Sequence, residues 1–163
     1  WRRYRNSYRN TLLWNVQGFF ERLLVGADLQ KATIIYTSDH GQDLQARPGK
    51  NLATHCGSEP RQDEGVVPLV VIDSANAPVL DWHRNLNANR NVSSAYNIFP
   101  TLVAMMGYQR ASIREHYGRG LDEVTNDPFT FNLNYYVLLG GDPRWRNIDI
   151  NQLYRPDNAD FMQ

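Results

Sequence analysis

The hydrophobic pattern at the start of the chain predicts a helix followed by strands. Over residues 8–24, apolar side chains recur at spacings of three and four, which places them on one helical face that packs on a core. After Gly26, where such a helix can stop, residues 32–37 form a short, β-branched run typical of a strand buried on both faces. A second run of this kind, residues 66–72, predicts another strand, in which Pro68 favours the strand start or a sheet edge. A helix that leads into a strand indicates an α/β fold.

The middle of the chain predicts a solvated segment and then a short helix. Residues 81–91 are polar and rich in asparagine, which favours a surface excursion. Ser93 or Ser94 then caps a short turn. Pro100 is expected at the first position of a helix that ends at Gly107.

The last part of the chain predicts a β-hairpin. Residues 129–139 alternate between apolar and polar side chains, and this period of two is typical of a strand with one solvated face. Residues 140–143 then turn the chain, and residues 145–150 are expected to form the partner strand. We expect the tail at residues 155–163 to be frayed.

Composition and charge exclude several classes of partner. The 163 residues suit one domain of ordinary size, and 17 basic residues against 17 acidic ones give a formal net charge of zero. Such a chain has no general attraction for nucleic acid or anionic lipid, so no nucleic-acid partner is expected. The single cysteine, Cys56, cannot form an internal disulfide. Because the chain begins at Trp1 rather than at a methionine, we expect it to be cut from something longer.

The candidate chemistry lies in the polar segment between the two predicted strands. Asp39, His40 and Gly41 follow the first strand directly, and a carboxylate oxygen and a neutral imidazole nitrogen are suitable ligands for a divalent metal ion. His55 follows on the same excursion, where it can reach a metal, a bound anion or a leaving group that needs a proton. An alternative stays open, in which Asp39 caps a local turn and His55 is a solvated loop residue.

These residues resemble a known family. The sequence ATIIYTSDHGQDL at residues 32–44, then His55, then EGVVPLVVI at residues 64–72, resembles the C-terminal half of the sulfatase and phosphoethanolamine-transferase branch of the alkaline-phosphatase superfamily. The segment SSAYNIFPTLVAMMG at residues 93–107 is similar to a later helix of that family. The resemblance implies an α/β fold, part of an alkaline-phosphatase-like sheet flanked by helices, with a C-terminal β-hairpin. It implies that residues 1–154 are the C-terminal portion of a sulfatase-like catalytic domain, followed by the tail.

The family's chemistry implies roles for three residues. Asp39 and His40 match the pair that coordinates the catalytic divalent metal, and His55 matches a histidine that contacts the transferred anionic group or a second metal. The reaction implied is metal-dependent hydrolysis or transfer of a phosphate or sulfate ester. Because the family's nucleophile lies in the N-terminal half, this chain is expected to supply half of an active site and to be inactive alone. Cys56 is rejected as a formylglycine precursor, because CGSEPR departs from the C-x-P-x-R signature.

The resemblance leaves the finer identity open. Zinc is favoured as the cofactor, with calcium, magnesium or manganese as alternatives, and the substrate is a phosphate or a sulfate ester. The implied partners are an anionic ester substrate, the missing N-terminal half of the same protein and a membrane anchor upstream. The implied location is periplasmic or extracytoplasmic. A different class of function, a non-catalytic sulfatase-like binding or regulatory module, stays open as the alternative.

Overall fold

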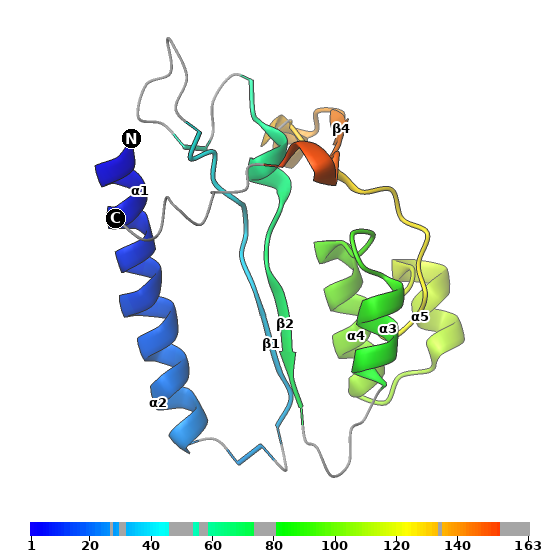
Figure 1. Ribbon diagram of the computed structural model, residues 1–163. Helices are drawn as coiled ribbons and strands as arrows, with labels where there is room; N and C mark the ends of the chain where they lie inside the picture. Colours follow the sequence, from blue (N-terminus) through cyan, green and yellow to red (C-terminus); the bar gives the residue numbers. More distant parts are fainter. Residues whose placement is uncertain are drawn as a thin grey trace. The chain divides into compact units, whose positions relative to one another are not determined.

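The chain divides into two compact units, which are described one at a time (Figure 1). A computed structural model describes residues 1–26, 28–29, 32–45, 54–55, 59–73, 81–133 and 135–153. Unit 1 comprises Trp1–Asp73 with Asp149–Gln163, and unit 2 comprises Ser74–Ile148. The helices and small sheets of the described residues confirm the predicted α/β class. Within those residues, no helix is both long and apolar enough to span a bilayer.

Unit 1 begins with one long helical segment. It consists of α1 (Arg2–Leu12), a π-helical turn (Leu13–Gln17) and α2 (Gly18–Gly26), so the predicted helix is confirmed but begins six residues earlier than the apolar pattern. The early start is polar and arginine-rich, and arginine has a high helix propensity that a search for apolar periodicity does not register. Phe20 of this segment meets Tyr36 of the first strand edge to face, with ring centroids 5.1 Å apart. The segment contacts the sheet at this point, but none of its described residues is buried, so the expectation that one face packs into a core is not met there.

The two strands of unit 1 lie inside the predicted runs. Strand β1 (Ile34–Thr37) pairs antiparallel with β2 (Leu69–Ile72), and Pro68 comes immediately before β2, as expected of a proline at a strand start. Every residue of β1 is half-buried, so the expectation of burial on both faces is wrong for the described residues. Because the strands run antiparallel, the end of β1 at Thr37 lies beside the start of β2. The long polar segment between them therefore leaves and returns at the same end of the sheet.

Unit 2 contains a helix where the sequence predicted a solvated segment. Helix α3 (Trp82–Ala88) is capped by Asp81, whose Oδ1 accepts the N–H of Arg84 at 3.1 Å. Trp82 is 8% exposed and Asn89 is 1% exposed, so both ends of this stretch are buried. Most of residues 81–91 are exposed, in line with the predicted surface segment. The helix itself was not predicted, because seven residues with one buried apolar side chain are too few to show an apolar period.

The next two helices of unit 2 form a pair. Helix α4 (Ile98–Met105) follows a short 3-10 turn (Ala95–Asn97), whose cap is Ser94 as predicted. Pro100 is the third residue of α4 rather than the first, because the 3-10 turn continues directly into the helix. Helix α5 (Arg110–Tyr117) was not predicted, since only Ile113 of its eight residues is buried.

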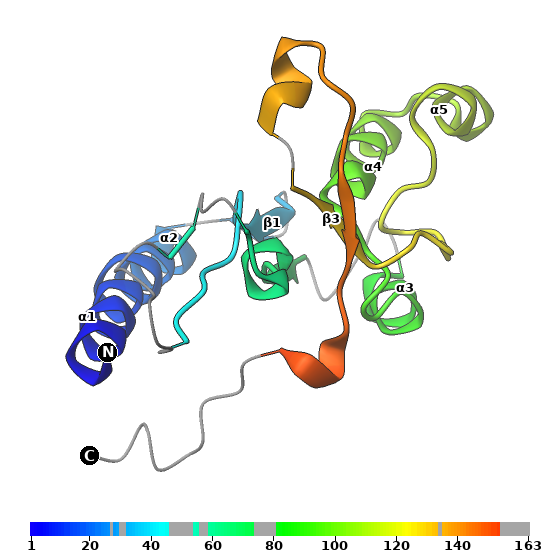
Figure 2. The ribbon, with the colours of Figure 1, turned by 90° about the horizontal axis from the view of Figure 1, so that it is seen from above.

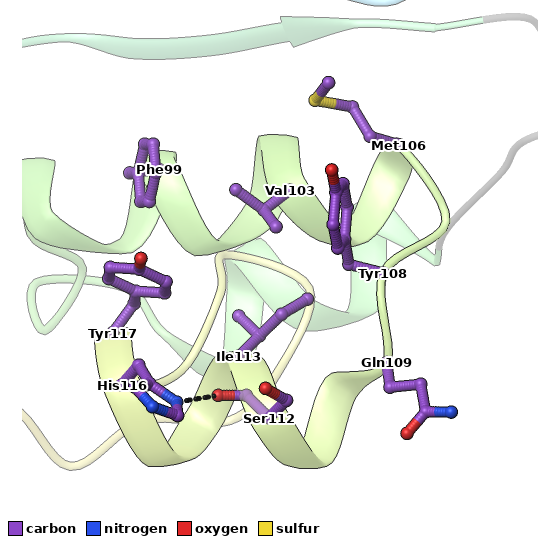
Figure 3. A pocket seen from close by; sticks show the side chains of 9 residues that line it. All are labelled: Phe99, Val103, Met106, Tyr108, Gln109, Ser112, Ile113, His116 and Tyr117. Carbon is purple, nitrogen blue, oxygen red and sulfur yellow. Dashed lines mark hydrogen bonds between the residues drawn. The ribbon is translucent and has the colours of Figure 1, made fainter.

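The pair of helices encloses a groove of about 700 Å³ (Figure 3). Its walls are mainly apolar and aromatic, with Phe99 and Val103 from α4 facing Ile113 and Tyr117 from α5. His116 is exposed and lies at the rim, where its Nδ1 is 2.8 Å from the carbonyl oxygen of Ser112. None of the nine side chains drawn around the groove carries a carboxylate. The groove is therefore an apolar surface with polar groups at its edge.

A buried polar side chain ties α4 to the loop that follows α5. Thr101 is fully buried, and its hydroxyl donates to the carbonyl oxygen of Asn97 at 2.6 Å while it accepts the N–H of Leu121 at 2.7 Å. Leu121 is itself 1% exposed, so its N–H has no access to water. The loop is thus held by hydrogen bonds to a helix side chain as well as by apolar burial.

Replacing Thr101 with valine is expected to destabilise unit 2. The substitution keeps the side-chain shape but leaves the buried N–H of Leu121 without its acceptor, which lowers the free energy of unfolding by about 1–3 kcal/mol. Urea denaturation of T101V measures this loss, and Thr101→Ser, which keeps the hydroxyl, is the matched control. A loss of stability in Thr101→Ser with none in T101V would show that the methyl group, and not the hydrogen bond, stabilises this contact.

The same loop carries an ion pair that makes stability depend on pH. Arg114 of α5 donates through Nε to Glu123 Oε1 at 2.6 Å. Burial raises the pKa of Glu123, but the hydrogen bonds from Arg114 and from the N–H of Gly120, with the charges of Arg114 and Arg110, outweigh it and leave the pKa below its ordinary value. A depressed carboxyl pKa contributes stability above the unfolded-state pKa, and this contribution is lost as pH falls through the folded-state value.

We therefore expect the difference in unfolding free energy between wild type and Glu123→Gln to be about 0.5–1 kcal/mol at pH 7, since Arg114 is largely exposed. The difference should shrink toward zero as the pH is lowered from 5 to 3, across the ordinary glutamate pKa of about 4.3. Denaturation of both proteins over this range measures it. A difference that does not change with pH would contradict a charged pair.

Unit 2 ends in the predicted β-hairpin, with shorter strands than expected. Strand β3 (Thr130–Asn132) pairs antiparallel with β4 (Trp145–Asn147) (Figure 2). The expected strand over residues 129–139 is wrong beyond Asn132, because residues 135–139 form a 3-10 turn. Leu138 and Leu139 are 91% and 79% exposed, so the alternation there does not mark a buried face. The predicted tail, residues 155–163, lies outside the described residues.

Candidate metal centre

Asp39 lies in the first turn after β1. Its Oδ1 accepts the backbone N–H of His40 at 3.0 Å and the hydroxyl of Ser38 at 3.3 Å. The side chain is 87% exposed, and its other oxygen, Oδ2, is 3.9 Å from Nε2 of His40. One oxygen thus makes the local turn contact of the alternative interpretation, while the second faces the imidazole and solvent.

The carboxyl group of Asp39 is held in its ionised form. The backbone N–H of His40, followed by the charge of the His40 ring, lowers the pKa of Asp39 below its usual value. An ionised carboxylate is the form that binds a cation. Asp39 is therefore a ready anionic ligand at neutral pH.

The ring of His40 is oriented by the next residue. Its Nδ1 is 2.8 Å from the carbonyl oxygen of Gly41, and because a carbonyl only accepts, Nδ1 carries the proton in the neutral ring. Nε2 then has the free lone pair, and this is the nitrogen beside Asp39 Oδ2. Histidines that bind metals commonly donate their other ring N–H to a backbone carbonyl or carboxylate in this way.

His55 is brought to His40 across the polar segment. The two ring centroids are 4.4 Å apart, with the planes inclined by 35°. The backbone N–H of Asp43 donates to the carbonyl oxygen of Thr54 at 2.8 Å, which fixes the residue before His55 against the residues that follow His40. His55 is exposed, as the solvated-loop alternative expects, but its ring lies beside that of His40. The roles of Asp39, His40 and His55 stay predictions.

Gly41 permits a contact that no other residue fits. Its N–H donates to the carbonyl oxygen of Glu64 at 2.7 Å. A Cβ atom at this position would lie 2.1 Å from the carbonyl oxygen of Asp63 and 2.5 Å from that of Val66. The structure therefore shows a close approach between two backbone segments at Gly41.

Asp43 is a site residue that the sequence did not single out. Its side chain is 1% exposed, and Oδ1 accepts the N–H of Gln45 at 3.1 Å. The carboxylate closes a local turn onto Gln45, and the backbone N–H of Asp43 makes the bond to the segment that carries His55. The pattern of residues around it resembles any polar loop, so only the tertiary contact identifies it.

Comparison with known proteins decides the family. The sulfatase family model matches residues 2–108, from the first helix through α4, and this stretch contains Asp39, His40 and His55. The chain belongs to the sulfatase family. Searches of curated proteins and of solved structures find no match to it. The sulfatase model supports the alkaline-phosphatase superfamily and does not single out the phosphoethanolamine-transferase branch.

Family membership supports sulfatase-like hydrolytic chemistry, and sulfatases generally use a divalent metal ion. The side chains of Asp39 and His40 fit a divalent metal ion in part, since a carboxylate oxygen and an imidazole nitrogen with a free lone pair face each other. Over the part of the sulfatase chain that the structure describes, no three His, Cys, Asp or Glu side chains gather as a metal site. The described residues therefore offer a pair of ligands, with the ring of His55 next to it.

Proposed function

We propose that this chain supplies the metal-binding half of an active site that hydrolyses or transfers a phosphate or sulfate ester. The ligands are Oδ2 of Asp39 and Nε2 of His40. One observation carries the proposal: the Nδ1 proton of His40 is directed to Gly41, which leaves Nε2 free at 3.9 Å from an ionised carboxylate. Membership of the sulfatase family supports the reaction class.

A divalent ion held there would polarise the ester oxygen, neutralise developing charge and lower the pKa of the nucleophile. Asp39 and His40 hold and orient it. His55, with its ring 4.4 Å from that of His40, is placed to contact the anionic ester group and to donate a proton to the leaving oxygen near neutral pH.

The remaining ligands and the nucleophile are proposed to come from the N-terminal half of the same protein. Two protein ligands leave a divalent ion undercoordinated, since catalytic zinc sites use three protein ligands and a solvent position. Zinc is the proposed metal because an imidazole nitrogen joins the carboxylate, with manganese, magnesium or calcium as alternatives. We further propose an extracytoplasmic, periplasmic location with a membrane anchor upstream.

Assays of the intact protein on an aryl sulfate and an aryl phosphate test this function. Activity should disappear with a chelator and return on addition of Zn²⁺ or Mn²⁺, whereas Asp39→Ala should stay inactive after metal is added. The control is Glu21→Ala, which removes a carboxylate whose hydrogen bond is to Gln17 on the same long helix. Chelator-resistant turnover would contradict the proposal, and metal uptake without turnover of either ester would favour a binding or regulatory module.

A further inference from the structure

We propose that Glu64 is a positioning residue that sets the orientation of the His40 ring. It acts through the 3-10 turn Gln62–Gly65, which lies against Gly41. Glu64 itself is not proposed to touch metal or substrate. The expected effect of Glu64 on metal binding rests on the proposed function. Its effect on the orientation of the His40 ring does not, because that orientation exists without a metal ion.

The side chain of Glu64 closes this turn on itself. Its Oε1 accepts the backbone N–H of Arg61 at 3.0 Å, and its own backbone N–H donates to the carbonyl oxygen of Arg61 at 3.0 Å. The contact from the Glu64 side chain is the one by which a glutamate at the third position ties back to the residue that precedes a helix, and the second bond is the backbone bond of the 3-10 turn itself. The turn's carbonyl groups are therefore held in fixed directions.

Those carbonyl groups surround Gly41. The oxygen of Glu64 accepts the N–H of Gly41 at 2.7 Å, and the oxygens of Asp63 and Val66 occupy the space that a Cβ atom of residue 41 would need. The turn thus holds the His40–Gly41 peptide through its N–H and closely surrounds the α-carbon of Gly41, which limits the directions that the next peptide can take. Its carbonyl oxygen is the group 2.8 Å from Nδ1 of His40. Glu64, the turn, the glycine and the imidazole form a series of contacts that ends at a proposed ligand.

The turn stays attached to unit 1 without the carboxylate of Glu64. Gln45 donates through Nε2 to Asp63 Oδ2 at 2.9 Å, and Gln62 Oε1 accepts the N–H of Asp149 at 2.8 Å. Loss of the Glu64 side chain is therefore expected to leave the turn in place while releasing its internal geometry. A variant of Glu64 should fold and still lose control of His40.

Two readouts on the intact protein test this role. The first is the tautomer of His40 without metal, from ¹⁵N–¹H NMR at a pH where the ring is neutral, and the second is the dissociation constant for Zn²⁺ by competition titration. Wild type should show the Nδ1–H tautomer. Glu64→Ala should shift His40 toward the Nε2–H tautomer and weaken Zn²⁺ binding about tenfold or more.

Three further variants separate geometry from charge. Glu64→Gln keeps an acceptor for the Arg61 N–H and should match wild type in both readouts, whereas Glu64→Asp keeps the charge but shortens the reach and should behave as Glu64→Ala. Glu21→Ala is the control for loss of a carboxylate. Two results would overturn the role of Glu64. The first is a Glu64→Ala protein with the wild-type His40 tautomer and Zn²⁺ affinity. The second is a Glu64→Gln protein in which the tautomer and the affinity change as much as in Glu64→Ala. If wild type binds no Zn²⁺ but the tautomers change as stated, the proposed function fails and the positioning role stands.

Discussion

Replacing Gly41 with alanine should disrupt the candidate site more than any other single methyl group. The new Cβ would lie 2.1 Å from the carbonyl oxygen of Asp63 and 2.5 Å from that of Val66. Both are backbone atoms, so no side-chain rotation relieves the overlap and one of the two segments must move. Overpacking of this kind lowers the free energy of unfolding by about 3 kcal/mol, and the movement should also separate Nδ1 of His40 from its carbonyl partner.

Urea denaturation and the Zn²⁺ dissociation constant measure the two effects of Gly41→Ala. Gly18→Ala is the matched control, because a Cβ there meets no atom closer than 4.0 Å and alanine favours the helix by about 0.5–1 kcal/mol. Gly18→Ala should be neutral or slightly stabilising. A Gly41→Ala protein with wild-type stability and Zn²⁺ affinity would contradict the close approach of residues 41 and 63–66.

Replacing His55 with alanine should lower kcat by about 10²–10⁴-fold while leaving metal affinity close to that of wild type. The reason is the division of roles in the site: Asp39 and His40 face each other, whereas the ring of His55 lies beside His40 and is proposed to serve the ester group. Steady-state kinetics on the better of the two aryl esters and Zn²⁺ titration together measure this separation.

His83→Ala is the control for His55→Ala, because His83 is an exposed histidine on α3. It should keep both kcat and metal affinity. If His55→Ala loses Zn²⁺ as completely as His40→Ala does, His55 is a metal ligand, and the proposed contact with the transferred group is wrong. An unchanged kcat in His55→Ala would remove it from the chemistry altogether.

The candidate site was predictable from the sequence because its chemistry is local. Asp39 and His40 are neighbours after an apolar, β-branched strand, and both the strand and the pairing of their side chains are present in the structure. The approach of His55 was an expectation from its place on the polar segment, and a backbone hydrogen bond from Asp43 to Thr54 accompanies it. Residue types that bind metal, placed after a strand end, single out these three residues as candidates, and their roles stay predictions.

The supporting contacts were not predictable because they depend on tertiary structure. In the sequence Glu64 and Asp63 are ordinary polar loop residues. Only the structure shows that the turn that contains them contacts Gly41. Helix α3 was missed for a related reason, since one buried tryptophan and an aspartate cap define it rather than an apolar period. In the C-terminal hairpin the apolar pattern misleads in the opposite way, because it predicts a strand where there is none. A clear period of two continues through Leu138, which is 91% exposed and lies in a 3-10 turn.

Metal content of the purified intact protein tests the central claim most directly. Inductively coupled plasma mass spectrometry should find close to one equivalent of a divalent metal in wild type and in Glu21→Ala, and less than about a tenth of that in Asp39→Ala and His40→Ala. Equal metal in all four proteins would show that the carboxylate and imidazole that face each other after β1 do not bind the metal.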